Sequence, residues 1–143
     1  MSRDAKLMSG ITLLAIPTIM YGGWTLLGLL THGSAGGTPG NLKLDDTQWA
    51  LWRAGHAHAG VWTMLSVVLQ LLLDSAELSK GMAWLSRICA PLAAVALSAG
   101  FFGTAFSDPF RWMLYVGIVL LSIALLLTAV GLLRGVKLHK APV

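Results

Sequence analysis

The chain has 143 residues, of which 56% are hydrophobic and only 11% are charged. A soluble domain carries about 25% charged residues, so this composition excludes a protein whose only solvent is water. The formal net charge is +4, but the basic residues collect at the ends of apolar segments and form no stripe that would suit a nucleic acid. We therefore expect one integral membrane domain, with lipid around it and no nucleic-acid partner.

Four apolar segments follow one another along the chain. The first covers about 7–30 without a charged residue, and at helical rise it spans roughly 36 Å, enough for a hydrocarbon core of about 30 Å. Pro17 lies inside it and predicts a kink. The other segments cover about 49–73, 82–106 and 112–133. The sequence thus predicts an all-α fold, a four-transmembrane-helix bundle.

Lysine and arginine positions predict the orientation of this bundle. Four crossings put both termini and the short link 74–81 on one side of the membrane. That side holds seven basic residues, and the other side holds three: Arg3, Lys6, Lys80, Arg87, Arg134, Lys137 and Lys140 against Lys43, Arg53 and Arg111. The excess of positive charge places both termini in the cytoplasm of a multi-pass protein in the inner or plasma membrane.

Two histidines of the second segment are the main functional candidates. His58 lies nine residues past Trp49, roughly 13 Å into the membrane, where a polar ring is costly unless it has a partner. Neutral imidazole is also the commonest side-chain metal ligand. His56 lies about 200° around the helix axis from His58, so the rings should not clamp one ion together. One ring is expected to face a ligand and the other to bond a neighbouring helix.

The residues around His58 suggest room for a cofactor. Ala54 and Gly55, one turn before it, leave space for a large flat ligand, and Trp62 lies one turn after it. Tyr21 sits at about the same depth in the first segment, where it either supplies a hydroxyl to a shared pocket or serves in packing. The alternative for His58 is a hydrogen bond to a side chain or carbonyl of an adjacent helix.

Four stretches of the chain match a known pattern. They are the first-helix run Lys6-Leu-Met-Ser-Gly-Ile with Tyr21-Gly-Gly-Trp24, a loop rich in glycine and proline, the second-helix run Trp52-Arg-Ala-Gly-His-Ala-His58-Ala-Gly60, and Gly100-Phe101-Phe102 with Ala-Phe-Ser at 105–107. In these stretches the chain resembles the styrene oxide isomerase family, whose members are small four-helix membrane proteins that bind haem b.

This resemblance implies a cofactor, an assembly and a reaction. It implies haem b between the subunits of a homotrimer, with His58 as the axial iron ligand. We expect the residues near His58 to lie around the cofactor, namely Ala54, Gly55, Trp62 and His56. Ferric iron would act as a Lewis acid and isomerise a small apolar epoxide from the bilayer to an aldehyde. Where the family has a substrate-orienting asparagine and tyrosine, this chain has Met64 and Phe102. We expect these two residues and Tyr21 to line the substrate pocket.

Two other functions remain open from the sequence. The first is a haem protein that is not an isomerase, such as a sensor, a carrier or an electron-transfer subunit. In that protein His58 and a second ligand, His56 or His32 of another subunit, would hold the iron from both sides. The second is a bundle without a cofactor that serves as a subunit of a larger complex. The membrane segments show no Ser–His–Asp set, phosphate loop or paired carboxylates that would indicate hydrolysis or phosphoryl transfer.

Overall fold

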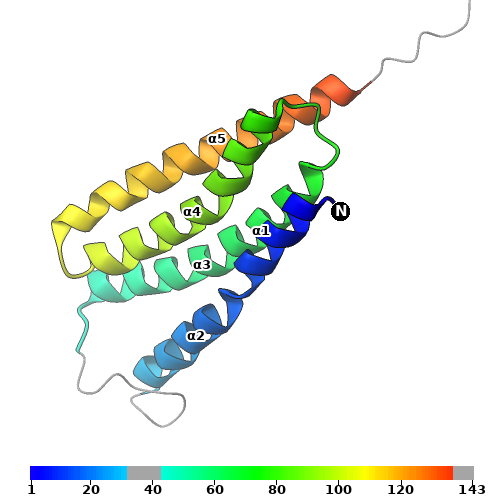
Figure 1. Ribbon diagram of the computed structural model, residues 1–143. Helices are drawn as coiled ribbons and strands as arrows, with labels where there is room; N and C mark the ends of the chain where they lie inside the picture. The colour runs from blue at the N-terminus through cyan, green and yellow to red at the C-terminus, as the bar shows by residue number, and fades with distance from the viewer. Residues whose placement is uncertain (32–42, 137–143) are drawn as a thin grey trace, which may run out of the picture.

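The computed structural model describes residues 1–31 and 43–136, and the regular structure of this part is entirely helical (Figure 1). The all-α prediction is confirmed for these residues. In chain order the elements are α1 (Arg3–Leu13), α2 (Ile16–Leu30), α3 (Asp46–Leu72), α4 (Lys80–Thr104), the 3-10 turn η1 (Asp108–Phe110) and α5 (Arg111–Gly135).

The first predicted segment consists of two consecutive helices. α1 begins after Ser2, whose hydroxyl accepts a hydrogen bond from the Ala5 backbone N–H at 3.1 Å. The helix is interrupted at Leu14 and resumes at Ile16, immediately before Pro17. Proline has no N–H to donate and its ring clashes with the preceding turn of a helix. The interruption therefore falls where the sequence predicts a kink.

Three helical segments are long and apolar enough to cross a membrane, which indicates a membrane protein. They are Arg3–Leu30, Lys80–Thr104 and Asp108–Gly135. α3 has 27 residues, or about 40 Å at helical rise, so its length would suffice. It is not one of the three, because polar side chains such as Arg53 and His56 lower its hydropathy. The described residues thus confirm three of the four predicted spans.

α4 lies between α3 and α5, while α1 and α2 pack against α3 (Figure 1). The contact between α4 and α5 is close because each helix presents a glycine to a leucine of the other. A Cβ added to Gly100 would lie 2.6 Å from Leu114, and one added to Gly117 would lie 2.6 Å from Leu97. Small residues at such positions let membrane helices approach closely. Because α4 runs antiparallel to each of its neighbours, α3 and α5 run in the same direction on either side of it (Figure 1).

An ion pair between the buried Arg87 and the more exposed Asp74 joins three helices at one end of the bundle. The Arg87 guanidinium donates to Asp74 Oδ1 at 2.7 Å and to the Gln70 carbonyl at 2.9 Å. The Gln70 side-chain amide donates in return to the Arg87 carbonyl at 3.0 Å. Asp74 also accepts hydrogen bonds of 2.6 Å from the N–H and the hydroxyl of Ser2. The start of α1, the end of α3 and the start of α4 are thereby tied together.

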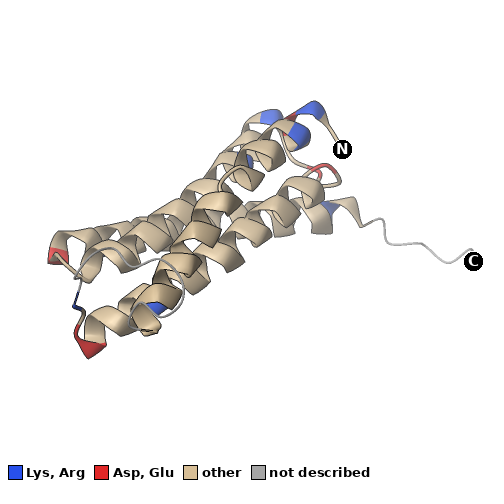
Figure 2. Ribbon diagram, turned by 90° about the horizontal axis from the view of Figure 1, so that it is seen from below, with Lys and Arg blue, Asp and Glu red and all other residues tan. Residues whose placement is uncertain are grey.

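The charged residues gather at the two ends of the bundle (Figure 2). The end of α5 lies at the link between α3 and α4, where the Glu77 backbone N–H donates to the Gly131 carbonyl at 2.9 Å. Asp74 of the same link bonds Ser2 at the start of α1, so α5 ends near the start of α1. By their places in the helices, the described basic residues of this end are Arg3, Lys6, Lys80, Arg87 and Arg134, while Lys43, Arg53 and Arg111 lie near the starts of α3 and α5, toward the other end. The predicted positions His32, Lys137 and Lys140 lie outside the described residues.

Candidate functional site

The His58 ring is held by its own helix. Its Nδ1 lies 2.7 Å from the carbonyl oxygen of Ala54, one turn earlier in α3. A carbonyl oxygen can only accept, so Nδ1 carries the hydrogen and donates it. In the neutral ring the lone pair then resides on Nε2, the nitrogen that is left free to bind a metal. The alternative bond to an adjacent helix is not found among the described residues.

The half-buried His58 side chain lines an apolar groove along the surface of the bundle. The groove has a volume of 280 Å³ and runs between α3 and α5 over α4, lined by His58, Trp62, Leu97, Phe101, Leu114, Ile118, Leu121, Ser122 and Leu125. A smaller hollow of 110 Å³ touches the same imidazole, lined by Ala57, His58, Val61 and Trp62. The ring therefore faces open apolar space on the outside of this chain.

Two aromatic rings contact the imidazole and restrict its rotation. The centroid of Phe101 in α4 lies 4.6 Å from that of His58, and the centroid of Trp62 lies 6.0 Å from it. The indole N–H of Trp62 is buried and has no hydrogen-bond partner among the described residues. A buried donor without a partner costs free energy, so this N–H is an unsatisfied polar group in the residue that packs against His58.

The two small residues before His58 have different roles. Ala54 supplies the carbonyl that fixes the ring. Gly55 faces α4, and a Cβ added there would lie 3.1 Å from Cε2 of Phe102 and 3.2 Å from Cβ of Phe101. Glycine thus allows the phenylalanine pair to pack against α3, which in turn brings Phe101 beside His58. Gly55 acts here through helix packing.

His56 lies on the opposite face of α3, as its spacing from His58 predicts. Its imidazole packs against the glycine pair of α2, where a Cβ on Gly23 would lie 2.9 Å from His56 Cε1 and a Cβ on Gly22 would lie 3.8 Å from Nδ1. His56 does not line the groove of His58. Within one chain the structure therefore keeps the two histidines in separate surroundings.

The three predicted substrate residues do not line this groove within one chain. Tyr21 is exposed on α2 beside Trp24, with ring centroids 5.9 Å apart. Met64 is exposed on α3. Phe102 makes an edge contact with Trp52, with centroids 5.6 Å apart. The structure brings together His58, Trp62 and Phe101, and it leaves Tyr21, Met64 and Phe102 outside that group.

Of the nine residues that line the groove, sequence reasoning placed only His58 and Trp62 at the site and missed the other seven, Leu97, Phe101, Leu114, Ile118, Leu121, Ser122 and Leu125. Leu97 and Phe101 lie four residues apart, which puts them on one face of α4. Ser122 is the one serine of the apolar helix α5 and lies eleven residues after Arg111, while His58 is twelve residues after Asp46. Because α3 and α5 run in parallel, this count places both side chains at a similar depth. The number of residues from each helix start was therefore the sequence signal that could have placed Ser122 near His58.

The donor set around His58 fits a metal that brings its own additional ligands. No group of three or more His, Cys, Asp or Glu side chains is placed to hold a metal ion in residues 1–31 and 43–136. A haem iron has four ring nitrogens from its macrocycle and takes one axial histidine from the protein. A single imidazole with a free Nε2 beside an apolar surface therefore fits the one axial position that a haem iron takes from the protein.

In comparisons with known proteins, no family model, no curated protein and no solved structure matches this chain.

Proposed function

We propose that this chain is a membrane haem b protein with His58 as the axial ligand, and that it isomerises small apolar epoxides to aldehydes. The hydrogen bond from His58 Nδ1 to the Ala54 carbonyl is the observation that carries the proposal. It sets the ring in the tautomer whose Nε2 can bind iron, and a partner on the other ring nitrogen makes a histidine ligand more basic. The motif resemblance given above supplies the reaction.

The protein's own groups have distinct tasks in this proposal. Ala54 orients the imidazole, while Phe101 and Trp62 hold it at the groove. The apolar lining excludes water, which would otherwise compete for the metal and hydrate the products. When bound, ferric haem supplies a Lewis acid that polarises an epoxide oxygen. The groove opens at the lipid-facing surface, so an apolar substrate would enter from the bilayer.

The proposal includes an assembly and an orientation. The groove of 280 Å³ is below the range of about 300–1,000 Å³ that is common for ligand pockets. A macrocycle on His58 would therefore need cover from another subunit, and we take a homotrimer, with haem at the subunit interface, from the family resemblance. α3 would cross the membrane with its neighbours as the fourth span. The end that holds Arg3, Lys80 and Arg134 would face the cytoplasm of a plasma-membrane protein.

A second candidate is a haem protein that is not an isomerase, such as a sensor, a carrier or an electron-transfer subunit. The observation that favours it is that Tyr21, Met64 and Phe102 all lie away from the groove in one chain. Ligation of the same iron by His56 of the same chain finds no support, because that ring packs against α2. The iron would then need its second ligand from another subunit.

An absorption spectrum of the purified protein tests the haem proposal. We expect a Soret band that disappears in His58→Ala and persists in His56→Ala, because only His58 lines the groove. Absence of the band from haem-supplemented wild-type protein would leave the cofactor-free bundle. Incubation with aryl epoxides then tests the reaction, with aldehyde measured by gas chromatography. A haem-loaded protein that gives no aldehyde from any epoxide would favour the second candidate.

A further inference from the structure

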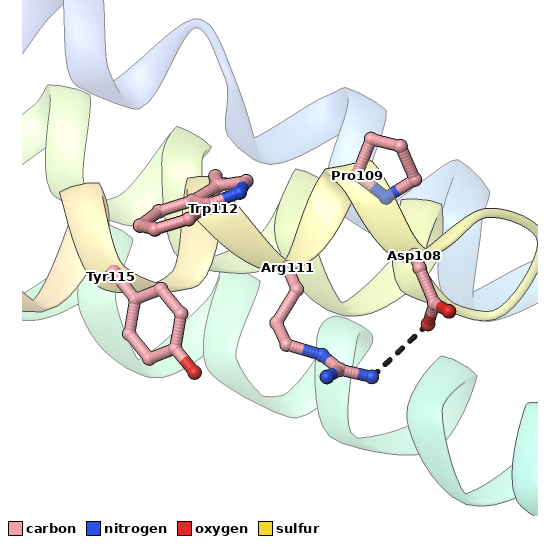
Figure 3. Close-up of a pocket in the computed structure, with 5 residues that line it drawn as sticks. All are labelled: Asp108, Pro109, Arg111, Trp112 and Tyr115. Carbon is pink, nitrogen blue, oxygen red and sulfur yellow. Dashed lines mark hydrogen bonds and ion pairs between the residues drawn. The ribbon is translucent and has the colours of Figure 1, made fainter.

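A second hollow lies where η1 leads into α5, at the opposite end of that helix from Arg134. It has a volume of 490 Å³ and is lined by Asp108, Pro109, Arg111, Trp112 and Tyr115 (Figure 3). None of these residues lines the groove of His58, so the two sites are independent. Arg111 Nη2 donates to Asp108 Oδ1 at 3.0 Å, and the two side chains are 57% and 85% exposed. A cation and an anion are thus presented together at the surface.

The turn that carries these charges is firmly packed. The Phe110 ring lies over Gly103 of α4, where an added Cβ would come within 2.2 Å of it, so only glycine fits. The Phe110 backbone N–H also donates to the Ser107 carbonyl at 3.2 Å. Asp108 and Arg111 lie on either side of Pro109 and Phe110 in the chain. Because Phe110 is packed against α4, the backbone positions of both charged residues are fixed.

The hollow lies at the level where lipid headgroups are expected. It sits at the end of two helices that are long and apolar enough to cross a membrane. Trp112 and Tyr115 are 71% and 52% exposed, and their ring centroids are 5.5 Å apart. Exposed tryptophan and tyrosine are enriched at the membrane–water interface, where they have an apolar and a polar side to satisfy. The ion pair therefore faces the headgroup layer.

The geometry points to a binding site for a zwitterionic phospholipid with a primary ammonium group, phosphatidylethanolamine. Its phosphate matches the guanidinium of Arg111, which forms paired hydrogen bonds to phosphate oxygens. Its ammonium, a few bonds away, matches the Asp108 carboxylate. The Tyr115 hydroxyl lies on the same side as the Arg111 guanidinium (Figure 3) and can donate to the phosphate. The acyl chains would lie along Trp112 and the apolar face of α5.

Binding of this headgroup replaces the ion pair between Arg111 and Asp108 with two ion pairs to the lipid. An exposed salt bridge contributes little by itself, so opening the pair between Arg111 and Asp108 costs little, and each residue gains a partner of opposite charge. Phosphatidylcholine has no N–H to donate to the carboxylate. Phosphatidylglycerol has no cation, and its negative charge would meet Asp108. The paired charges therefore select for the ethanolamine headgroup over both.

Native mass spectrometry of the detergent-solubilised full chain tests this site. We expect phosphatidylethanolamine to bind about fivefold to tenfold more tightly than phosphatidylglycerol or phosphatidylcholine of the same acyl chains, the preference that one net hydrogen bond gives. Asp108→Asn should abolish the preference over the other two lipids. Arg111→Gln should weaken all three. Arg134→Gln, which removes a cation from the far end of the same helix, should change nothing, and circular dichroism confirms that each variant is folded.

Three outcomes would overturn the assignment. An equal lipid preference in wild type and Asp108→Asn would show that the carboxylate selects nothing. Tighter binding of phosphatidylglycerol would show a general anion site. Full competition by soluble phosphoethanolamine would show a site for a free anion and none for a membrane lipid. The test is independent of haem, because it can be made on protein with and without a Soret band.

Discussion

The backbone of Gly23 in α2 lies directly against the imidazole of His56 in α3. A Cβ on that glycine would come 2.9 Å from Cε1 and 3.0 Å from Nε2 of the ring. The His56 ring thus packs against α2 at a position where glycine lets the two helices approach closely. His56 thereby belongs to the joint between α2 and α3, while His58 faces the groove over α4 and α5.

This contact predicts different effects for the two neighbouring glycines. Gly23→Ala should force the His56 ring to move and should lower the free energy of unfolding in detergent by about 1–3 kcal/mol, the usual range for overpacking. Gly22→Ala is the matched control, because its Cβ would lie 3.8 Å from the ring, an ordinary contact. Thermal unfolding in the same detergent measures both. Equal losses in the two variants would contradict the packing described here.

The glycine at position 55 predicts a similar contrast within α3. Gly55→Ala should push Phe101 and Phe102 outward, since its Cβ would lie 3.1 Å from Phe102. We expect a loss of about 1 kcal/mol. Gly60→Ala has no atom within 4 Å of the new methyl group and should leave stability unchanged or raise it by up to about 1 kcal/mol, through the better helix propensity of alanine. The reverse ranking in chemical denaturation would show that α3 and α4 pack differently.

The carboxylate at the end of α3 predicts a dependence of stability on pH. Burial alone raises the pKa of Asp74, but hydrogen bonds from Ser2 and the Arg87 guanidinium outweigh it and lower the pKa to about 2 from an ordinary 3.8. The folded state therefore binds fewer protons than the unfolded state over this interval. The stability that this carboxylate contributes is fully present above about pH 4 and is lost as the pH falls through about 2.

Asp74→Asn isolates that contribution. The variant should be less stable than the wild type at pH 6, and the difference should shrink as the pH is lowered toward 2. Melting temperatures measured across this range give the comparison. A difference that stays constant down to pH 2 would mean that Asp74 has the same pKa in the folded and the unfolded protein, contrary to its bonds with Ser2 and Arg87.

The helices were predictable because each one reads as an apolar run with recognisable ends. The predicted segment 82–106 corresponds to Lys80–Thr104, and 112–133 corresponds to Arg111–Gly135. The start of α3 was placed too late at 49, although the sequence carried a signal. Asp45 caps the helix by accepting from the Gln48 N–H, and the Gln48 side chain accepts from the Asp45 N–H, which is a capping box.

The neighbours of His58 could not be predicted in the same way. Helical periodicity places His56 and His58 on opposite faces of α3, and the structure agrees. It cannot give the register of α4 against α3, which depends on the contacts of Gly55 with the phenylalanine pair. That register puts Phe101 beside the imidazole and Phe102 against Trp52. The roles of Tyr21, Met64 and Phe102 in a substrate pocket stay predictions.

Chemical rescue of His58→Gly measures the central proposal most directly. Removal of the side chain leaves a hollow beside Phe101 and Trp62 that free imidazole can enter. We predict that the variant, purified with haem present, lacks the Soret band of the wild type and regains it when imidazole is added, while His56→Gly keeps the band throughout. A wild-type protein without the band, or a His58→Gly variant that retains it without imidazole, would contradict axial ligation by His58.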